Sequence, residues 1–174
     1  MINMFVPDIY QKSIYDINYN KLKKNGIKCI IFDLDNTIAP INQKSPKKKV
    51  KDLIEDLKAM KFKIIIVSNS PKKRVEPFKD ILSVDSAYLA TKPLKTKYKK
   101  IQKIYRFKDT EIACVGDQLL TDIWGANRVG FLSILINPIG TLDFAPTKIN
   151  RLVEIAIYNH LEKKDLLKKG HYYD

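Results

Sequence analysis

Hydrophobic residues gather in five short runs along the chain, and several of these runs are rich in β-branched side chains. Short apolar runs of this kind are typical of buried strands. Successive runs lie far enough apart to leave room for a helix, and this alternation predicts a parallel sheet in an α/β layered domain. The five predicted strands cover residues 27–32, 63–67, 86–89, 111–115 and 131–136.

Apolar residues recur at helical spacing between these runs. Pro46 suits the first turn of one helix, and Gly130 and Gly170 suit the ends of two others. The predicted helices cover residues 45–60, 74–82, 96–105, 119–129 and 148–169. We expect the last helix to cover one side of the sheet with an apolar face made of Ile149, Leu152, Val153, Ala156, Ile157 and Leu161.

The segment before the first predicted strand also shows helical spacing. Tyr10, Ile14 and Ile17 fall at i, i+4 and i+7 after Pro7, which predicts a short helix. Packing on the same core explains these apolar positions more simply than a role at a membrane surface does.

The length and composition are those of one globular domain. The chain has 174 residues, of which 45% are hydrophobic, enough for one substantial core. We expect a single domain over residues 1–174, with an N-terminal segment (1–26) packed on the motif-bearing core (27–136) and a C-terminal helix (147–169). No apolar run is long enough to cross a bilayer, and residues 1–28 lack the pattern of a secretion signal. We therefore expect a soluble, cytoplasmic protein; the sequence does not indicate its oligomeric state.

The charge balance is strongly basic. Lys and Arg number 32 against 19 Asp and Glu, so the formal net charge is +13. A positive field attracts nucleic acid, acidic lipid or phosphate esters. Only four of the basic residues are arginines, the type that binds phosphate in a bidentate manner, and a Lys-rich composition can reflect the genome alone. We favour the compositional explanation and keep peripheral association with the inner, anionic membrane surface as an alternative.

Polar residues come at the end of each of the first four predicted strands. Because the carboxyl ends of parallel strands lie along one edge of a sheet, these residues should form one site. The four segments are Asp33-Leu34-Asp35-Asn36-Thr37, Ser68-Asn69, Thr91-Lys92-Pro93 and Gly116-Asp117-Gln118-Leu119-Leu120-Thr121-Asp122.

These residue types match the needs of phosphoryl transfer, which requires a nucleophile, an acid or base, a metal, and cations or hydroxyls that neutralise the phosphoryl oxygens. Asp33 and Asp35 are alternate residues leaving a strand, so they can share a site and take different duties. Asp117 adds a further carboxylate of the kind that Mg²⁺ prefers.

The order of these segments resembles the four motifs of the haloacid dehalogenase (HAD) superfamily. The resemblance implies a Rossmann-like, three-layer sandwich around a parallel sheet of about five strands. It also implies that Asp33 is the nucleophile and that Asp35 protonates the leaving alcohol and then activates water. The motifs stand here as Asp33-x-Asp35-x-Thr37, Ser68, Lys92 and Gly116-Asp117-x-x-x-x-Asp122.

The same resemblance implies roles for the other motif residues. Thr37 positions the loop, and Lys92 neutralises charge on the phosphoryl group. The implied contacts to substrate come from Asn36, Ser68, Asn69 and Lys92. Mg²⁺ is expected on Asp33, the backbone carbonyl of Asp35, and Asp117, with Asp122 as a further ligand or as a partner of one.

The motif spacing leaves no room for a large cap domain. Thr37 to Ser68 accommodates a loop, a helix and a strand, and Ser68 to Lys92 accommodates a helix and a short strand. An open site suits a phosphate carried on something large. Over nearly its whole length the chain resembles the capless (subclass IIIA) YqeG group of bacterial phosphatases, which is similar to mitochondrial phosphatidylglycerophosphate phosphatases. That likeness implies a phosphorylated lipid head group as a candidate substrate.

Two other functions stay open. One is a phosphatase of nucleotides, sugar phosphates or nucleic-acid ends. The other is a basic protein that binds nucleic acid or a ribonucleoprotein. The joint presence of the acid Asp35, Lys92 and the metal carboxylates argues against this second alternative.

Overall fold

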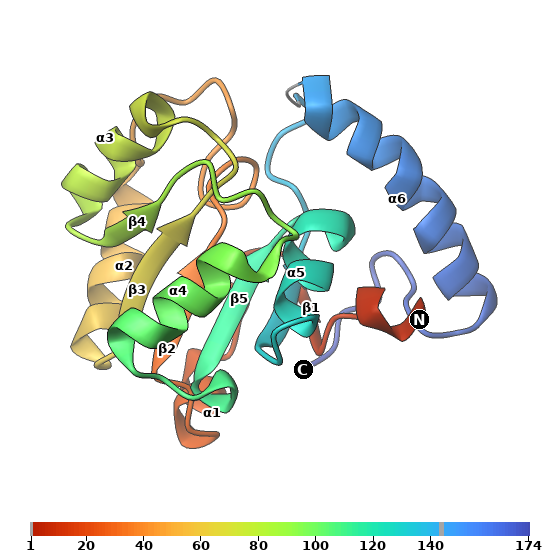
Figure 1. The fold of residues 1–174 in the computed structure, drawn as a ribbon, viewed down its shortest axis with the longest axis horizontal. Helices are drawn as coiled ribbons and strands as arrows, with labels where there is room; N and C mark the ends of the chain where they lie inside the picture. Colours follow the sequence, from red (N-terminus) through yellow and green to blue (C-terminus); the bar gives the residue numbers. More distant parts are fainter. Residues whose placement is uncertain (1, 143–144) are drawn as a thin grey trace.

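The sheet has six parallel strands, one more than predicted. The computed structural model describes residues 2–142 and 145–174. The strands run in the order β1-β6-β5-β2-β3-β4 (Figure 1), so β2 and β5 lie at the centre. Their bounds are β1 (Ile9–Gln11), β2 (Cys29–Phe32), β3 (Lys63–Val67), β4 (Asp85–Ala87), β5 (Ile112–Gly116) and β6 (Leu132–Ile136).

Helices cover both faces of the sheet and give the predicted three layers. Alternate residues of β2 point to opposite faces, and both sets are buried. Ile30 and Phe32 pack in one cluster with α1 (Tyr19–Lys24), α2 (Lys48–Ala59) and α3 (Lys72–Leu82). Cys29 and Ile31 pack in the other with α4 (Lys95–Tyr105) and α5 (Trp124–Asn127).

The sixth strand lies where the sequence predicted a helix, and that prediction is wrong. Residues Ile9–Gln11 form β1, which pairs in parallel with β6. The amide of Tyr10 donates to the carbonyl of Tyr173 at 2.9 Å, and the amide of Tyr173 donates back at the same distance. The open edge of β6 and the C-terminal segment thus supply backbone partners that local spacing cannot reveal. Ile14 and Ile17 are buried in the core all the same.

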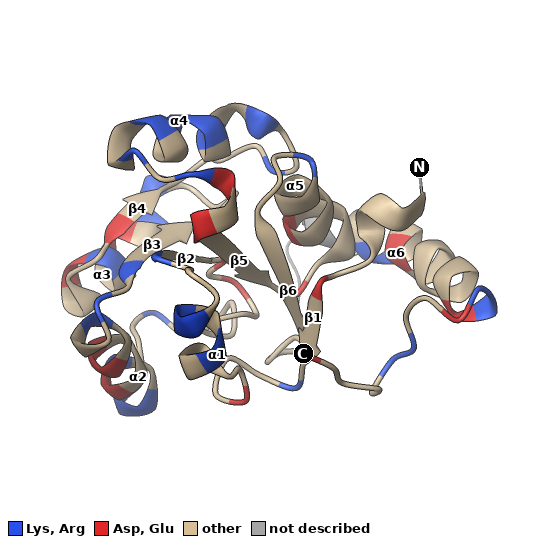
Figure 2. Ribbon diagram, turned by 90° about the horizontal axis from the view of Figure 1, so that it is seen from below, with Lys and Arg blue, Asp and Glu red and all other residues tan. Residues whose placement is uncertain are grey.

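The C-terminal helix α6 (Ala145–Lys163) ends before residue 169, the predicted end, and only part of its predicted apolar face is covered: Leu161 is buried and Ile157 is partly buried. Leu152 is 70% exposed and Val153 is 46% exposed, whereas Glu154 is buried. In both ribbon views α6 stands beside the sheet rather than over one of its faces (Figures 1 and 2). Its second half packs through Leu161 against Tyr10 and the turn after β5. The side chain of Ile149 lies outside the described part of the structure.

Shorter turns complete the fold. The predicted helix 119–129 is a single π turn (Leu119–Ile123) that continues into α5. Short 3₁₀ turns occupy Ile2–Phe5 and Asp109–Glu111. None of the helices in the described part combines the length and hydropathy that crossing a bilayer demands.

Candidate active site

The four polar segments meet at the carboxyl edge of the sheet, around an open pocket of about 330 Å³. All four motifs contribute to this edge, as expected from the parallel topology. The pocket is lined by Asp33, Asp35, Ser68, Asn69, Ser70, Pro71, Lys92, Gln118, Thr121 and Asn150.

Lys92 links two of the motif carboxylates beneath the pocket. Its Nζ lies 2.6 Å from Oδ1 of Asp33, which follows β2, and 2.5 Å from Oδ1 of Asp122, which belongs to the π turn. All three side chains are less than a tenth exposed. The ammonium therefore holds together strand ends that lie far apart in the sequence.

This cluster contains more negative than positive charge. Burial raises the pKa of Asp33 well above its usual range, and the carboxylates of Asp122 and Asp117 add to the effect while Lys92 opposes it. Burial by itself would lower the pKa of Lys92, but Asp122 and Asp33 outweigh burial and raise it well above its usual value. Lys92 is consequently a fixed positive charge, and the carboxylates around it favour a further cation.

Asp117 ends β5 and is completely shielded from solvent. Thr37 donates a hydrogen bond from Oγ1 to Oδ1 of Asp117 at 3.2 Å. Arg151 of α6 contacts Oδ2 of Asp117 and also donates from Nη1 to its backbone carbonyl at 3.0 Å. Burial raises the pKa of Asp117 to about 7, against the opposing effect of Arg151.

Three buried carboxylates could hold a metal ion. Asp33, Asp117 and Asp122 each offer an oxygen, and these oxygens lie within 4.8 Å of one another. An all-oxygen, anionic donor set suits a hard divalent cation such as Mg²⁺ or Mn²⁺. The raised pKa values of Asp33 and Asp117 agree with a site designed for a bound cation.

Asp35 is held apart from that cluster. Ser70 donates from Oγ to Oδ2 of Asp35 at 2.6 Å, and Nε of Arg74 lies 2.8 Å from Oδ1. Arg74 also donates to the carbonyls of Pro40, at 3.2 Å, and Gln43. One guanidinium thus fixes both the carboxylate and the loop that leads into α2.

Of the remaining residues predicted to contact substrate, Ser68 and Asn69 line the pocket, whereas Asn36 does not. Asn69 accepts from the amide of Lys92 at 2.7 Å and donates to its carbonyl at 3.2 Å, so it fixes the Lys92 loop. Ser68 is buried and accepts from the amide of Ser70 at 3.0 Å. Asn36 has a positive φ of 63°, is buried, and donates to the carbonyl of Leu142 at 2.8 Å.

Gly116 is needed for the approach of Asp122. A Cβ built on Gly116 would lie 2.2 Å from Cγ of Asp122 and 2.4 Å from its Cβ. The π turn brings Asp122 back over the end of β5, where its Oδ2 accepts from the amide of Gln118 at 3.1 Å. Only a residue without a side chain leaves room for this contact.

Sequence reasoning assigned no role to Ser70, Arg74, Arg151 or Glu154. Glu154 is buried, accepts from the amide of Leu120 at 2.9 Å, and lies 3.1 Å from Arg151. Because the chain has only four arginines, their positions were the available signal for these contacts. Of the four arginines, Arg74 and Arg151 contact motif carboxylates, and Arg128 donates to the carbonyl of Pro93 at 3.2 Å.

Comparison with known sequences identifies the family. Residues 2–140 match the family described as mitochondrial PGP phosphatase. The chain belongs to this family. The match ends before α6, so the contacts of Arg151 and Glu154 come from outside the matched residues.

Two proteins similar to the chain agree with its assignment to the PGP phosphatase family. A probable phosphatase YqeG of Bacillus subtilis is 35% identical over 92% of this chain and 93% of that protein. A phosphatidylglycerophosphate phosphatase of Arabidopsis thaliana, chloroplastic or mitochondrial, is 27% identical over 95% of this chain. The alignment spans 51% of the Arabidopsis protein.

Solved structures share the fold. A D,D-heptose bisphosphate phosphatase from B. bronchiseptica, in complex with magnesium and phosphate, has a TM-score of 0.52 at 19% identity, over 63% of this chain and 80% of that one. A cobalt-bound octulosonate 8-phosphate phosphatase from Haemophilus influenzae has a TM-score of 0.52 at 14% identity, over 78% and 91%. The family match and the Bacillus subtilis relative identify the chain as a phosphatase, a hydrolase of phosphoric monoesters.

Replacing Gly116 by alanine should disable the site. The added Cβ displaces Asp122 and with it Lys92, and misplacement of catalytic groups by about 1 Å can cost on the order of a hundredfold in rate. Initial rates of phosphate release from a soluble aryl phosphate test this. Gly170→Ala is the control, because its Cβ meets no atom within 4 Å and Gly170 does not line the pocket. Its φ of +82° strains an alanine, so this control also measures the effect of backbone strain away from the site. Near-normal activity of Gly116→Ala would contradict the prediction, because it would show that activity does not require Asp122 in this position.

The stabilisation by added Mg²⁺ should grow with pH. Burial raises the pKa of Asp117 from 3.8 to about 7. The fold thus holds this proton more tightly than the unfolded chain, and the stability due to this group falls as pH rises across that interval. Protons compete with the cation below about pH 7, so the Mg²⁺-induced rise in melting temperature should be larger at about pH 8 than at about pH 5.5. Asp117→Asn should reduce the difference without removing it, because Asp33, whose pKa is also raised, would still exchange a proton for the cation. An equal rise at both pH values in the unmodified protein contradicts the prediction.

Proposed function

We propose that the chain is a Mg²⁺-dependent phosphatase that acts through an aspartyl-phosphate on Asp33. The observation that carries this proposal is the buried cluster in which Lys92 bridges Asp33 and Asp122 at the floor of an open pocket. Asp33, Asp117 and Asp122 are the groups that would hold Mg²⁺. When bound there, Mg²⁺ would offset the negative charge of the phosphoryl group and of the carboxylates.

The first half of the reaction transfers the phosphoryl group to the protein. A carboxylate oxygen of Asp33 attacks phosphorus, and the bond from phosphorus to the alcohol oxygen breaks. Asp35, held by Ser70 and Arg74, donates its proton to the departing oxygen. Lys92 stabilises the negative charge on the phosphoryl oxygens.

The second half releases phosphate. The carboxylate of Asp35 removes a proton from water, and the resulting hydroxide attacks phosphorus. The bond between phosphorus and Asp33 breaks, which returns Asp33 as a carboxylate, Asp35 in its protonated form, and inorganic phosphate. Ser68 and Asn69 line the pocket where the phosphoryl group is expected.

The substrate that we propose is a phosphomonoester on a lipid head group, reached from the cytoplasmic face of a membrane. The family assignment and the Arabidopsis relative support a lipid substrate. The absence of a large inserted domain between Thr37 and Lys92 supports access by a large substrate, since only α2, β3, α3 and β4 occupy that stretch. The net charge of +13 favours an anionic surface.

Soluble phosphate esters are the second candidate. The two solved phosphatases with the same fold are described as acting on phosphorylated sugars or sugar acids. Both candidates use the same chemistry at Asp33, so substrate preference must be measured.

Phosphate release should be selective for the lipid and should depend on Asp33. The panel is phosphatidylglycerophosphate in mixed micelles, nucleotides, sugar phosphates and an aryl phosphate, each with and without Mg²⁺. We expect Asp33→Asn to lower turnover by at least about 10⁴-fold, because the nucleophile is lost.

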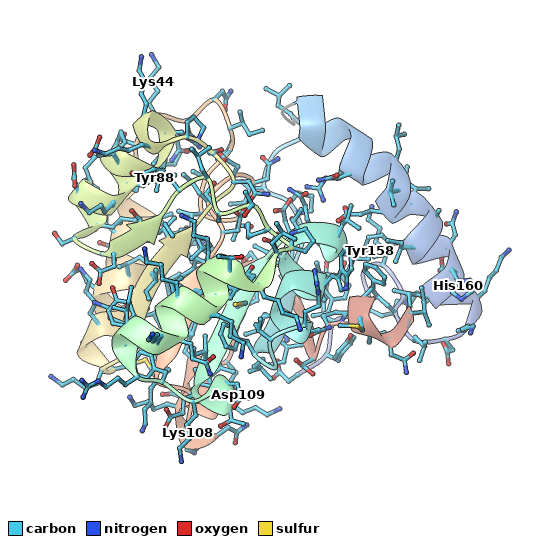
Figure 3. The ribbon with its side chains drawn as sticks, viewed as in Figure 1. Lys44, Tyr88, Lys108, Asp109, Tyr158 and His160 are labelled. Atoms are coloured by element: carbon cyan, nitrogen blue, oxygen red, sulfur yellow. The ribbon has the colours of Figure 1, made fainter. Side chains whose placement is uncertain are left out.

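The matched control is Asp109→Asn, which makes the same chemical change at an exposed position at the opposite end of the molecule (Figure 3). Its turnover should be unchanged. Comparable turnover of sugar phosphates and lipid removes the lipid preference, and retained activity in Asp33→Asn removes the aspartyl-phosphate mechanism.

A further inference from the structure

The charges along α2, α3 and α4 are arranged against the helix dipole. None of these helices has an acidic residue in its first turn. Lysines occupy those turns instead, and the acidic residues of α2 and α3, such as Asp52 and Asp80, come later. Because a helix N-terminus favours negative charge, lysine is disfavoured there. Lys48 and Lys72 offset part of that cost through i,i+4 ion pairs with Asp52 and Glu76. A Lys-rich composition explains how many lysines the chain has, but not why they begin three helices.

These helix starts surround the active site. The helices run back antiparallel to the strands, so they begin at the edge where the strands end (Figure 1). Lys47, Lys73 and Lys95 are exposed there, and within the described residues none of them forms an ion pair. Lys28, at the opposite edge, is paired with Glu111 at 2.7 Å.

Figure 2 shows basic residues on helices at both sides of the sheet, so the total charge does not mark a face. The placement against the helix dipole is what distinguishes the active-site edge. Figure 3 shows Lys44 pointing outward at this edge, whereas Lys108 lies at the other end of the molecule.

Exposed apolar side chains lie on the same edge. Leu89 and Leu94, in the loop after β4, are 54% and 52% exposed, and Leu142, after β6, is 58% exposed. The amide of Leu89 donates to the carbonyl of Ser70, a pocket residue, at 3.0 Å. Leu89 has a positive φ of 44°, a strained conformation for leucine that nevertheless presents its side chain to solvent.

We propose that this docking edge, formed by Lys47, Lys73, Lys95, Leu89, Leu94 and Leu142, binds an anionic lipid bilayer and turns the pocket toward the head groups. The proposal rests on the proposed function and specifies how its substrate is reached. Lysines near an anionic surface each strengthen binding about fivefold, and the leucines can enter the interface between head groups and acyl chains.

The chemistry of the edge favours a membrane over nucleic acid. Nucleic-acid sites use arginine and aromatic side chains to contact phosphates and stack on bases. The arginines nearest the pocket, Arg74 and Arg151, are bound to Asp35 and Asp117. Exposed leucines have no comparable partner on a nucleic acid.

Vesicle co-sedimentation of the full chain tests the proposal. The unmodified protein should bind phosphatidylcholine vesicles that contain phosphatidylglycerol and should not bind vesicles of phosphatidylcholine alone. Changing Lys47, Lys73 and Lys95 together to Glu should weaken binding on the order of a hundredfold or more. The variant should melt no lower than the unmodified protein, because Glu in a first turn suits the helix dipole.

The charge-matched control changes Lys24, Lys103 and Lys108 to Glu, which alters the net charge equally at the opposite edge. Because Lys24 and Lys103 lie in last helix turns, where Glu is disfavoured, the melting temperature of this variant is measured alongside. We expect its vesicle binding to fall far less. A second pair compares Leu89→Ser with Ile104→Ser, since Ile104 is 58% exposed at the far end of α4. Only Leu89→Ser should weaken vesicle binding.

Equal loss of binding in both lysine variants, or failure of the unmodified protein to bind anionic vesicles at low salt, overturns the proposal. So does a single-stranded RNA that competes with vesicles for the same three lysines. Turnover of a soluble aryl phosphate at high ionic strength separates the two claims. Activity without edge-dependent vesicle binding refutes the docking edge alone, and edge-dependent binding without activity on any ester refutes the phosphatase function alone.

Discussion

The ammonium of Lys92 lies between the carboxylates of Asp33 and Asp122, and the geometry of the pocket depends on that contact. It joins the ends of β2 and β5 to the loop after β4 in a place that water scarcely reaches. Charges buried in this way are costly unless they are paired, and removing one partner of a buried pair costs about 3–5 kcal/mol. The contact therefore fixes Asp33, the residue proposed as the nucleophile. The three carboxylates that surround the single ammonium could hold a divalent cation.

Around that contact, the backbone has little freedom. Gly116 leaves the space that Asp122 fills, and the π turn returns the Asp122 side chain to the end of β5. Asn69 holds the backbone of Lys92 from the neighbouring strand end. The charged groups of the site are thus positioned by strand ends and tight turns, which hold them more precisely than long loops would.

The same edge carries features that do not serve the stability of the fold. Lysines begin α2, α3 and α4, where the helix dipole disfavours them, and Leu89 is both strained and exposed. Helix α6 reaches the site through Arg151 and Glu154 while it leaves Leu152 in solvent. Several local rules of stability thus fail near the pocket, which is where function can outweigh them.

The sequence by itself determined the parallel α/β sheet and the four motif segments, because strand periodicity and the residues that follow each strand are local properties. It did not reveal β1, whose backbone partners are β6 and the C-terminal segment. Nor did it reveal the contacts of Arg74 and Arg151, or that α6 buries Glu154 and exposes Leu152 and Val153. Those features depend on which distant segments meet, and only the tertiary structure decides that. The spacing of Tyr10, Ile14 and Ile17 fits a helix, for example, but the open edge of β6 offers hydrogen bonds that make residues 9–11 a strand.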